Sequence, residues 1–255
     1  MIQSDFLRIG VVPYANGLPL EHFLPNYLPQ ARIIRAVPSA LGKMLAAGEL
    51  DVAMLSTIEL ARHPEYGFIP GLGIGSDGPV ASVMLFCSQE CRNVSTVALD
   101  QSSLTSVTMA RILFAEYWKR NPRYMPFTPP LDNGLRDADA ALMIGDPALE
   151  FNGSVLRKLD MGECWRDYCG LPFVYAAWIT GPGLDPESLQ EPFHRALAEG
   201  LKALDALSRI RAGQSSKPPE FFFDYYTRCV RYQLGDRELE GLRFFLDRAR
   251  EHGIV

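Results

Sequence analysis

The sequence lacks the features that place a chain in a membrane, a disulfide scaffold or a nucleic-acid complex. Among its 255 residues no apolar run approaches the length of about 20 that spans a bilayer. Its five cysteines are odd in number and include no C-x-x-C pair, so we expect free thiols in a reducing cytoplasm. The formal net charge is -5 with no basic block, so neither nucleic acid nor a membrane surface is an expected partner.

The N-terminal residues also lack the pattern of a secretory signal. Residues 1–10 read Met-Ile-Gln-Ser-Asp-Phe-Leu-Arg-Ile-Gly, without a basic segment followed by a long apolar one. We therefore expect a cytoplasmic location.

Several common catalytic motifs are missing as well. The chain contains no H-E-x-x-H, G-x-S-x-G or Walker motif, and we expect neither a metal nor a cofactor. The four histidines lie away from the polar strand ends described below, and we expect them on surfaces or helices. A site that is rich in hydroxyl and amide groups but poor in bases favours the binding of an oxygen-rich anion. It also suits chemistry that depends on positioning and charge stabilisation.

What the sequence does contain is an alternation of apolar strands and amphipathic helices. Hydrophobic residues make up 47% and charged residues 22%, which is typical of a globular protein with a real core. Strands are expected at residues 7–12, 31–37 and 50–55, each followed by a helix. This order predicts an α/β fold with largely parallel sheets, in which ligands bind beyond the carboxyl ends of the strands.

Two long apolar strands divide the chain. The strands at residues 80–87 and 173–179 bracket a middle block, which predicts two lobes with a ligand cleft between them. We assign residues 1–85 and 174–255 to the first lobe and residues 86–173 to the second. The glycine- and proline-rich stretch at 66–76 is expected to cross the surface. The C-terminal region is expected to be helical, with one helix over 221–234.

The segment 97–114 is the most informative stretch. An apolar run passes through a polar cluster and then becomes a helix-period stripe. The cluster consists of Gln101, Ser102, Ser103, Thr105 and Ser106. Unpaired N–H groups at a helix start, together with the helix dipole, form a site for an anionic oxygen. Without a glycine-rich phosphate loop, a carboxylate is the expected guest. The alternative is that these residues only cap their own helix.

Other polar residues fall at similar strand ends. Asn16 follows the first strand, and Ser56 and Thr57 follow the third. Asp146 precedes Pro147 after a further strand and is a plausible helix cap. Ser82 lies in an almost wholly apolar strand, so its hydroxyl must bond either the backbone or a ligand.

Several short motifs, in this order and spacing, resemble one known family. They include Tyr14-Ala15-Asn16-Gly17-Leu18-Pro19-Leu20, Gly48-Glu49-Leu50-Asp51-Val52-Ala53, Val80-Ala81-Ser82-Val83, Ser103-Leu104-Thr105-Ser106-Val107, Ile144-Gly145-Asp146-Pro147, Leu159-Asp160-Met161-Gly162 and Gly170-Leu171-Pro172-Phe173. From about Arg8 to Trp178 the chain resembles the chorismate dehydratase family of the futalosine route to menaquinone.

The resemblance implies a two-lobed fold of the periplasmic-binding-protein type (type II), turned here to catalysis. The implied enzyme is a hydro-lyase that removes water from chorismate to give 3-[(1-carboxyvinyl)oxy]benzoate. Asn16 and Ser82 would then lie nearest the chemistry. Substrate-binding groups are assigned by motif as Ser56, Thr57, Ser103, Thr105, Ser106, Gly145 and Asp146.

Three other functions remain open. One is a non-catalytic solute-binding protein for a small aromatic carboxylate. Another is the related 1,4-dihydroxy-6-naphthoate synthase, which is expected to use a histidine base in the cleft. A third is a family member that acts on a related benzoate.

Overall fold

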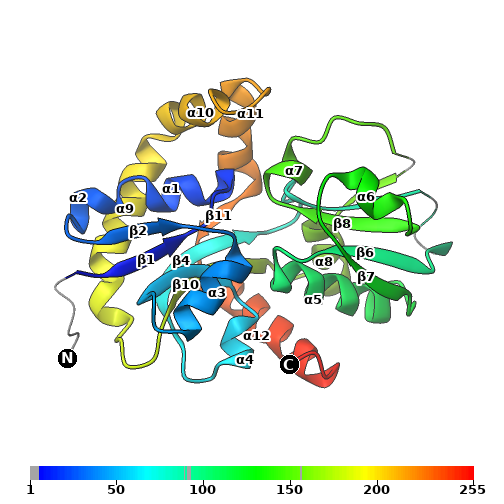
Figure 1. Cartoon of the computed structure of the whole chain (residues 1–255), viewed down its shortest axis with the longest axis horizontal. Coiled ribbons are helices and arrows are strands. Elements are labelled where there is room, and N and C mark those ends of the chain that lie inside the picture. Colours follow the sequence, from blue (N-terminus) through cyan, green and yellow to red (C-terminus); the bar gives the residue numbers. More distant parts are fainter. Residues whose placement is uncertain (1–5, 89, 91–92, 156) are drawn as a thin grey trace. The chain divides into compact units, whose positions relative to one another are not determined.

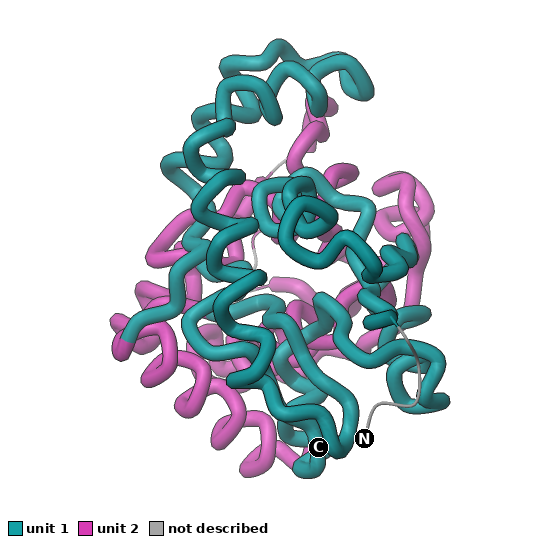
Figure 2. The backbone as a smooth tube through the Cα atoms, turned by 90° about the vertical axis from the view of Figure 1, so that its left-hand side faces the viewer, with its two compact units in different colours: residues 1–75, 174–235 teal, residues 76–173, 236–255 magenta. Residues whose placement is uncertain are grey.

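The structure is a computed structural model that describes residues 6–88, 90, 93–155 and 157–255. The chain divides into two compact units, which Figure 2 colours separately. The first unit comprises Met1–Gly75 and Val174–Gly235, and the second comprises Ser76–Phe173 and Asp236–Val255. The chain therefore passes between the units three times, after Gly75, Phe173 and Gly235.

This division differs at two segments from the one expected from sequence. Residues 76–85 and 236–255 group with the second unit instead of the first. The first segment belongs to the second unit because β5 (Val83–Cys87) pairs with two strands of that unit, β8 (Ala140–Ile144) and β9 (Arg157–Asp160). The second segment belongs to the second unit because the last helix packs on that unit, as described below.

The described residues of the first unit form a six-stranded sheet in the order β11-β4-β10-β3-β1-β2. Figure 1 labels its strands β1, β2, β4, β10 and β11. Strand β1 pairs in parallel with both β2 and β3, whereas β10 pairs antiparallel to β3, so the sheet is mixed. Its strands are β1 (Arg8–Val11), β2 (Arg32–Arg35), β3 (Val52–Ser56), β4 (Gly67–Ser76), β10 (Phe173–Thr180) and β11 (Arg231–Gln233).

The helical elements of the first unit follow the strands closely along the chain. They are η1 (Ala15–Gly17), α1 (Leu18–Glu21), α2 (Leu24–Tyr27), α3 (Pro38–Ala46), α4 (Glu59–Arg62), η4 (Glu187–Leu189), α9 (Gln190–Lys202), α10 (Leu204–Ala212), α11 (Pro219–Asp224) and η5 (Tyr225–Cys229). Pro38 is the first residue of α3, where its fixed φ suits a helix start, and Gly48, with φ +70°, follows the end of the helix.

Close backbone packing joins α9 to α1 in the first unit. A Cβ at Gly200 would lie 2.1 Å from the Pro19 carbonyl oxygen, so only glycine lets the two helices approach this closely. Nearby, Trp178 of β10 packs edge-on against Phe193 of α9, with ring centroids 4.9 Å apart. These contacts fix α1, and with it the turn that carries Asn16, on the first sheet.

The described residues of the second unit form a five-stranded sheet in the order β7-β6-β8-β5-β9. Strands β7 and β8 pair in parallel with β6, while β5 runs antiparallel to both of its neighbours. The remaining elements are β6 (Thr96–Asp100), α5 (Leu104–Ile112), η3 (Leu113–Tyr117), β7 (Arg123–Phe127), α6 (Leu131–Leu135), α7 (Asp146–Leu149), α8 (Met161–Cys169) and α12 (Asp236–Glu251).

The second unit has an apolar cluster and an aromatic cluster. The apolar cluster includes Phe86 and Met143 of the sheet and Leu131 of α6. In the aromatic cluster, the fully buried Trp165 of α8 meets Phe173 at 4.8 Å between ring centroids, and Phe173 meets Phe245 of α12 at 4.9 Å. The second cluster explains why α12 belongs to this unit.

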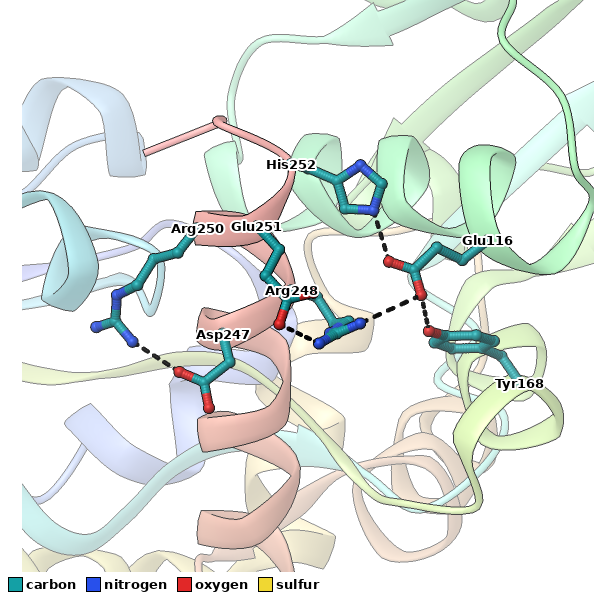
Figure 3. A network of polar contacts seen from close by, with 7 residues as sticks. All are labelled: Glu116, Tyr168, Asp247, Arg248, Arg250, Glu251 and His252. Atoms are coloured by element: carbon teal, nitrogen blue, oxygen red, sulfur yellow. Dashed lines mark hydrogen bonds and ion pairs between the residues drawn. The ribbon is translucent and has the colours of Figure 1, made fainter.

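A polar network reinforces the attachment of α12 (Figure 3). Glu116 of η3 accepts a hydrogen bond from the Tyr168 hydroxyl, and its Oε1 lies 2.5 Å from Nε2 of His252. Arg248 Nη1 lies 3.9 Å from Glu116 Oε2. Burial raises the pKa of Glu116, but Tyr168, His252 and Arg248 outweigh it, so the pKa lies below its ordinary value.

Three expectations from sequence are corrected by the structure. The stretch 66–76 is a long strand inside a sheet, because Gly73 lets β4 approach the backbone of β10: a Cβ there would lie 2.6 Å from the Ala176 carbonyl oxygen. The expected helix at 221–234 ends at Cys229 and continues as the strand β11. Both sheets are mixed and not largely parallel.

The cysteines agree with expectation where they are described. Cys87, Cys164, Cys169 and Cys229 lie outside any disulfide that the structure defines. Cys91 lies outside the described residues. No helix in the described part of the chain is long and apolar enough to cross a membrane.

Candidate functional site

One polar edge of the first unit carries three of the predicted site residues. Strands β1 and β3 pair in parallel, so their carboxyl ends lie at the same edge of the sheet. Asn16 follows β1 in the short turn η1, and Ser56 and Thr57 stand at the end of β3. Ser56 is 6% exposed and Thr57 is fully buried. The structure thus brings the predicted residues of this unit to one edge.

Asn16 has an unsatisfied acceptor at this edge. Its side-chain Oδ1 is buried and has no hydrogen-bond partner among the described residues. A buried carbonyl without a partner costs about 1–3 kcal/mol, which a donor on a bound molecule or a water would recover. The Asn16 carbonyl can accept a hydrogen bond from a bound molecule.

Thr57 has a structural task that sequence reasoning did not foresee. Its hydroxyl donates to the Val174 carbonyl at 2.8 Å, and its N–H donates to the Tyr175 carbonyl at 3.2 Å. Both bonds fasten the end of β3 to β10. The hydroxyl proton is therefore committed to the fold.

The second unit has a corresponding polar edge. The carboxyl ends of the parallel strands β6 and β8 lie beside the amino end of the antiparallel strand β5, because Val83 pairs with Ile144. Ser82, 2% exposed, precedes β5, and its carbonyl accepts the Gly145 N–H at 2.8 Å. Gly145, Asp146, Ser82 and the start of α5 therefore share this edge.

The start of α5 supports the capping interpretation of its serines. Ser103 is the N-cap, its Oγ accepting the Ser106 N–H at 3.4 Å and lying 3.1 Å from Ser106 Oγ. The side-chain amide of Gln101 donates to the Leu99 carbonyl at 2.8 Å. Thr105 and Ser106 are almost fully buried. Capping is confirmed for Ser103, and carboxylate binding by this helix start remains a prediction.

The start of α7 differs by one residue from the expectation. Gly145, with φ +69°, is the N-cap, and Asp146 is the first helical residue, followed by Pro147. Glycine fits because the backbone here is left-handed. Since the Asp146 carboxylate would repel an anionic ligand, any favourable contribution of this residue to anion binding must come from its backbone.

Two carboxylates at this edge were missed as functional candidates in the sequence. Asp100 ends β6, is 3% exposed, and accepts from Ser102 N and Oγ at 3.0 and 2.6 Å and from Ile144 N at 3.4 Å. Asp160 ends β9 and accepts only backbone N–H groups in the bonds that the structure defines. Two sequence patterns could have indicated them. D-x-S at Asp100 is typical of a turn held by the aspartate side chain, and D-x-x-E at Asp160 is typical of a helix start.

The titration of Asp160 reflects its burial. Burial raises the pKa of its carboxyl above the ordinary value, and the N–H groups of Val80, Ala81, Glu163 and Gly162 offset this only in part. Asp160 therefore depends on its donors to remain charged.

The histidines lie on helices and their ends, as expected. His22 follows α1, His63 follows α4 and stacks on Tyr66, His194 of α9 bonds the Pro70 carbonyl, and His252 follows α12. None of these positions is a carboxyl end of β1, β3, β6 or β8. Among residues 6–88, 90, 93–155 and 157–255, no three or more His, Cys, Asp or Glu side chains form a cluster that could hold a metal.

Known structures share the architecture. A protein from Archaeoglobus fulgidus matches with a TM-score of 0.78 at 16% identity, covering 99% of this chain and 100% of its own. The periplasmic aliphatic sulphonate binding protein from Escherichia coli matches with a TM-score of 0.61 at 16% identity, covering 99% and 94%. The expected fold of the periplasmic-binding-protein type is thereby confirmed.

Sequence comparison identifies the family. A chorismate dehydratase from Thermus thermophilus is 28% identical over 258 residues, which is 94% of this chain and 93% of that protein. The family model described as menaquinone biosynthesis matches residues 7–251. The chain therefore belongs to the menaquinone biosynthesis family.

Proposed function

We propose that this protein is a chorismate dehydratase, a hydro-lyase that converts chorismate to 3-[(1-carboxyvinyl)oxy]benzoate and water. The observation that carries the proposal is the pair of polar strand-end edges, one in each unit, at the positions where the family motifs stand. The relative from Thermus thermophilus, which bears this name, matches nearly the whole chain. We keep the cytoplasm as the proposed location of the reaction.

The substrate chemistry fits these two edges. Chorismate is a dicarboxylate, so it requires two sets of N–H and hydroxyl donors. We assign one carboxylate to Ser103, Thr105 and Ser106 at the start of α5, with Gly145 and Asp146 beside them. At the polar edge of the first unit we assign Ser56 to the substrate, and Thr57 holds the end of β3 beside it through its bonds to β10. The positive end of the α5 dipole favours an anion at this point.

The reaction needs no strong protein base. The ring proton beside the enolpyruvyl ether is acidified by the diene and the ring carboxylate. In a stepwise elimination, the substrate's own enolpyruvyl carboxylate takes this proton, and the carbon–oxygen bond to the ring hydroxyl then breaks. The departing hydroxide recovers the proton as water, and the ring becomes aromatic. Binding of the ring carboxylate stabilises the anionic intermediate.

Asn16 and Ser82 position the reacting groups in this scheme. The buried Oδ1 of Asn16 needs a donor, and the substrate hydroxyl or the protonated carboxyl supplies one. Ser82 belongs to the turn before β5, at the edge that also carries Gly145. Orientation of this kind contributes to rate by holding reacting atoms in near-attack geometry.

A direct assay tests the proposal. Purified protein is incubated with chorismate, and the aromatic product is followed by absorbance and identified by mass. Asn16→Ala and Ser82→Ala are expected to lower kcat at least about a hundredfold, as loss of positioning does. Ser88→Ala is the matched control, because Ser88 follows the opposite end of β5 and bonds the Asp139 carbonyl.

Each outcome discriminates between the candidate functions. Chorismate binding without turnover by the wild-type protein would favour a solute-binding protein. Turnover of a related benzoate, without turnover of chorismate, would show that the substrate is that benzoate. Near wild-type turnover in both variants would remove the roles assigned to Asn16 and Ser82.

A further inference from the structure

A single carboxylate joins the Ser82 turn to the start of α8. Asp160 Oδ2 accepts from Ala81 N at 2.7 Å and from Val80 N at 3.0 Å, and Oδ1 lies 3.0 Å from the same Val80 N. Oδ1 also accepts from Gly162 N at 2.9 Å and Glu163 N at 3.2 Å, which caps α8. One side chain therefore binds two segments that are about 80 residues apart along the chain.

The turn that Asp160 holds is strained. Ala81 has φ +62°, a left-handed conformation that costs a residue with a Cβ of order 1–2 kcal/mol. The Ser82 N–H donates to the Val80 carbonyl at 2.8 Å, which closes a three-residue turn around Ala81. Such a turn persists only where its surroundings determine it, and the two N–H bonds to Asp160 provide that determination.

The three-residue turn around Ala81 also fixes the backbone of Ser82. Its N–H is bonded to Val80, and its carbonyl accepts the Gly145 N–H at 2.8 Å. The next residue, Val83, enters β5 opposite Ile144. With both backbone groups of Ser82 engaged, the turn conformation sets the direction of its Cα–Cβ bond, from which the hydroxyl projects.

The segments on either side of Asp160, β9 and α8, are anchored in the second unit. Met84 pairs with Asp160 across β5 and β9. Helix α8 is held by Trp165, which is fully buried against Phe173 and Phe245. The carboxylate therefore couples the turn to a rigid part of the second unit.

We propose that Asp160 is a positioning residue that holds the Val80–Ala81–Ser82 turn in its strained conformation and so sets the Ser82 side chain for the reaction. This inference rests on the proposed function of Ser82. Asp160 itself does not touch the substrate. It acts through the backbone of Val80 and Ala81.

The first test is Asp160→Asn. The amide keeps the size of the side chain but turns one acceptor into a donor, which opposes one of the backbone N–H groups. We expect kcat for chorismate to fall about 10- to 100-fold, because small displacements of a positioned group have effects of this size. KM is expected to change less than about threefold, because none of the residues that Asp160 bonds is assigned to a substrate carboxylate.

Asp139→Asn is the matched control. Asp139 also accepts several bonds within the second unit, from Ser95 N at 2.9 Å and from Thr96 N and Oγ1 at 3.0 Å. It acts at the amino end of β6, away from the Ser82 turn. We expect stability to fall in this variant and kcat to stay within about twofold of wild type, since no positioned group is displaced.

Ala81 provides the test that a purely structural role would not pass. Ala81→Gly removes the strain of the left-handed conformation, so the double variant Asp160→Asn, Ala81→Gly should recover at least about threefold of the lost kcat. Ala81→Val disfavours the same conformation and leaves the α8 cap intact. It should lower kcat even if Asp160→Asn does not fold.

A measurement without substrate separates this inference from the proposed function. Hydrogen exchange at the Val80 and Ala81 amides should be slow in the wild-type protein and at least about tenfold faster in Asp160→Asn or Ala81→Val. If the wild-type protein fails to turn over chorismate, the proposed function fails while the exchange result still tests the turn. Unchanged exchange, or faster exchange with wild-type kcat and KM, would overturn the positioning role.

Discussion

Arg8 of β1 and Asp51, the residue before β3, form a bidentate ion pair in the first unit. Arg8 Nη2 lies 2.7 Å from Asp51 Oδ1, and Arg8 Nε donates to Oδ2 at 3.1 Å. The Arg8 backbone N–H donates to the same Oδ2 at 2.7 Å. The pair therefore joins β1 to the residue that precedes β3. Asn16 follows β1 and Ser56 ends β3, so the ion pair links the two strands that carry these residues.

Asp51→Asn should lower the free energy of unfolding of the first unit. Charge-assisted hydrogen bonds contribute about 1.5–3 kcal/mol each when well placed, and partial exposure of Arg8 reduces this to an expected loss of about 1–2 kcal/mol. Urea denaturation followed by circular dichroism measures it. Asp247→Asn, at an exposed pair with Arg250, should leave stability unchanged.

The same ion pair predicts a dependence of stability on pH. Burial raises the pKa of Asp51, but the hydrogen bonds and charge of Arg8 outweigh it and hold the pKa below its ordinary value. The stability that Asp51 contributes is present above roughly pH 4, where the unfolded carboxyl is charged, and is lost as the pH falls through the folded-state pKa. The stability difference between wild type and Asp51→Asn should shrink in that range, and a constant difference would contradict this.

Gly200→Ala should destabilise the packing of α9 on α1. The new Cβ would lie 2.1 Å from the Pro19 carbonyl oxygen, so the helices must separate at a cost of about 1–3 kcal/mol. Gly42→Ala is the matched control within α3, where the nearest atom is Glu59 Oε1 at 3.9 Å. It should stabilise the protein by about 0.5–1 kcal/mol through helix propensity, and equal effects of both changes would refute this reading of the packing.

Ser103 allows the capping and binding roles of one residue to be separated. Ser103→Ala should cost about 1 kcal/mol of stability through loss of the cap. Ser103→Asp keeps a capping acceptor but adds a negative charge at the proposed carboxylate site. We expect near wild-type stability in that variant with KM for chorismate raised roughly tenfold, equivalent to about 1.4 kcal/mol. An unchanged KM would leave Ser103 as a cap alone.

Glu116→Gln should loosen the attachment of α12 to the second unit. The neutral side chain loses its charge-assisted contacts with His252 and Arg248 (Figure 3). Hydrogen exchange of the α12 amides should become faster, while Glu251→Gln, at an exposed partner of Arg248, should have little effect. Because the pKa of Glu116 is lowered, its contribution is present above roughly pH 4–5 and is lost as the pH falls further.

Local patterns in the sequence were sufficient for most elements and for the edges of the site. Apolar runs located β1, β3, β5 and β8, and helix signals such as Pro38 and Gly48 located α3. The serine cluster after β6 correctly indicated a capped helix start. These features depend on residues a few positions apart, so the sequence alone contains the information.

Other features depend on partners far away in the chain. The sequence by itself determined an α/β chain with hydroxyl and amide groups at strand ends, because periodicity and capping are short-range properties. The tertiary structure decided that 66–76 is a sheet strand, that α12 joins the second unit, and that Asp160 holds the turn before Ser82. Each of these is set by close packing or hydrogen bonding between distant segments, which local preference does not encode.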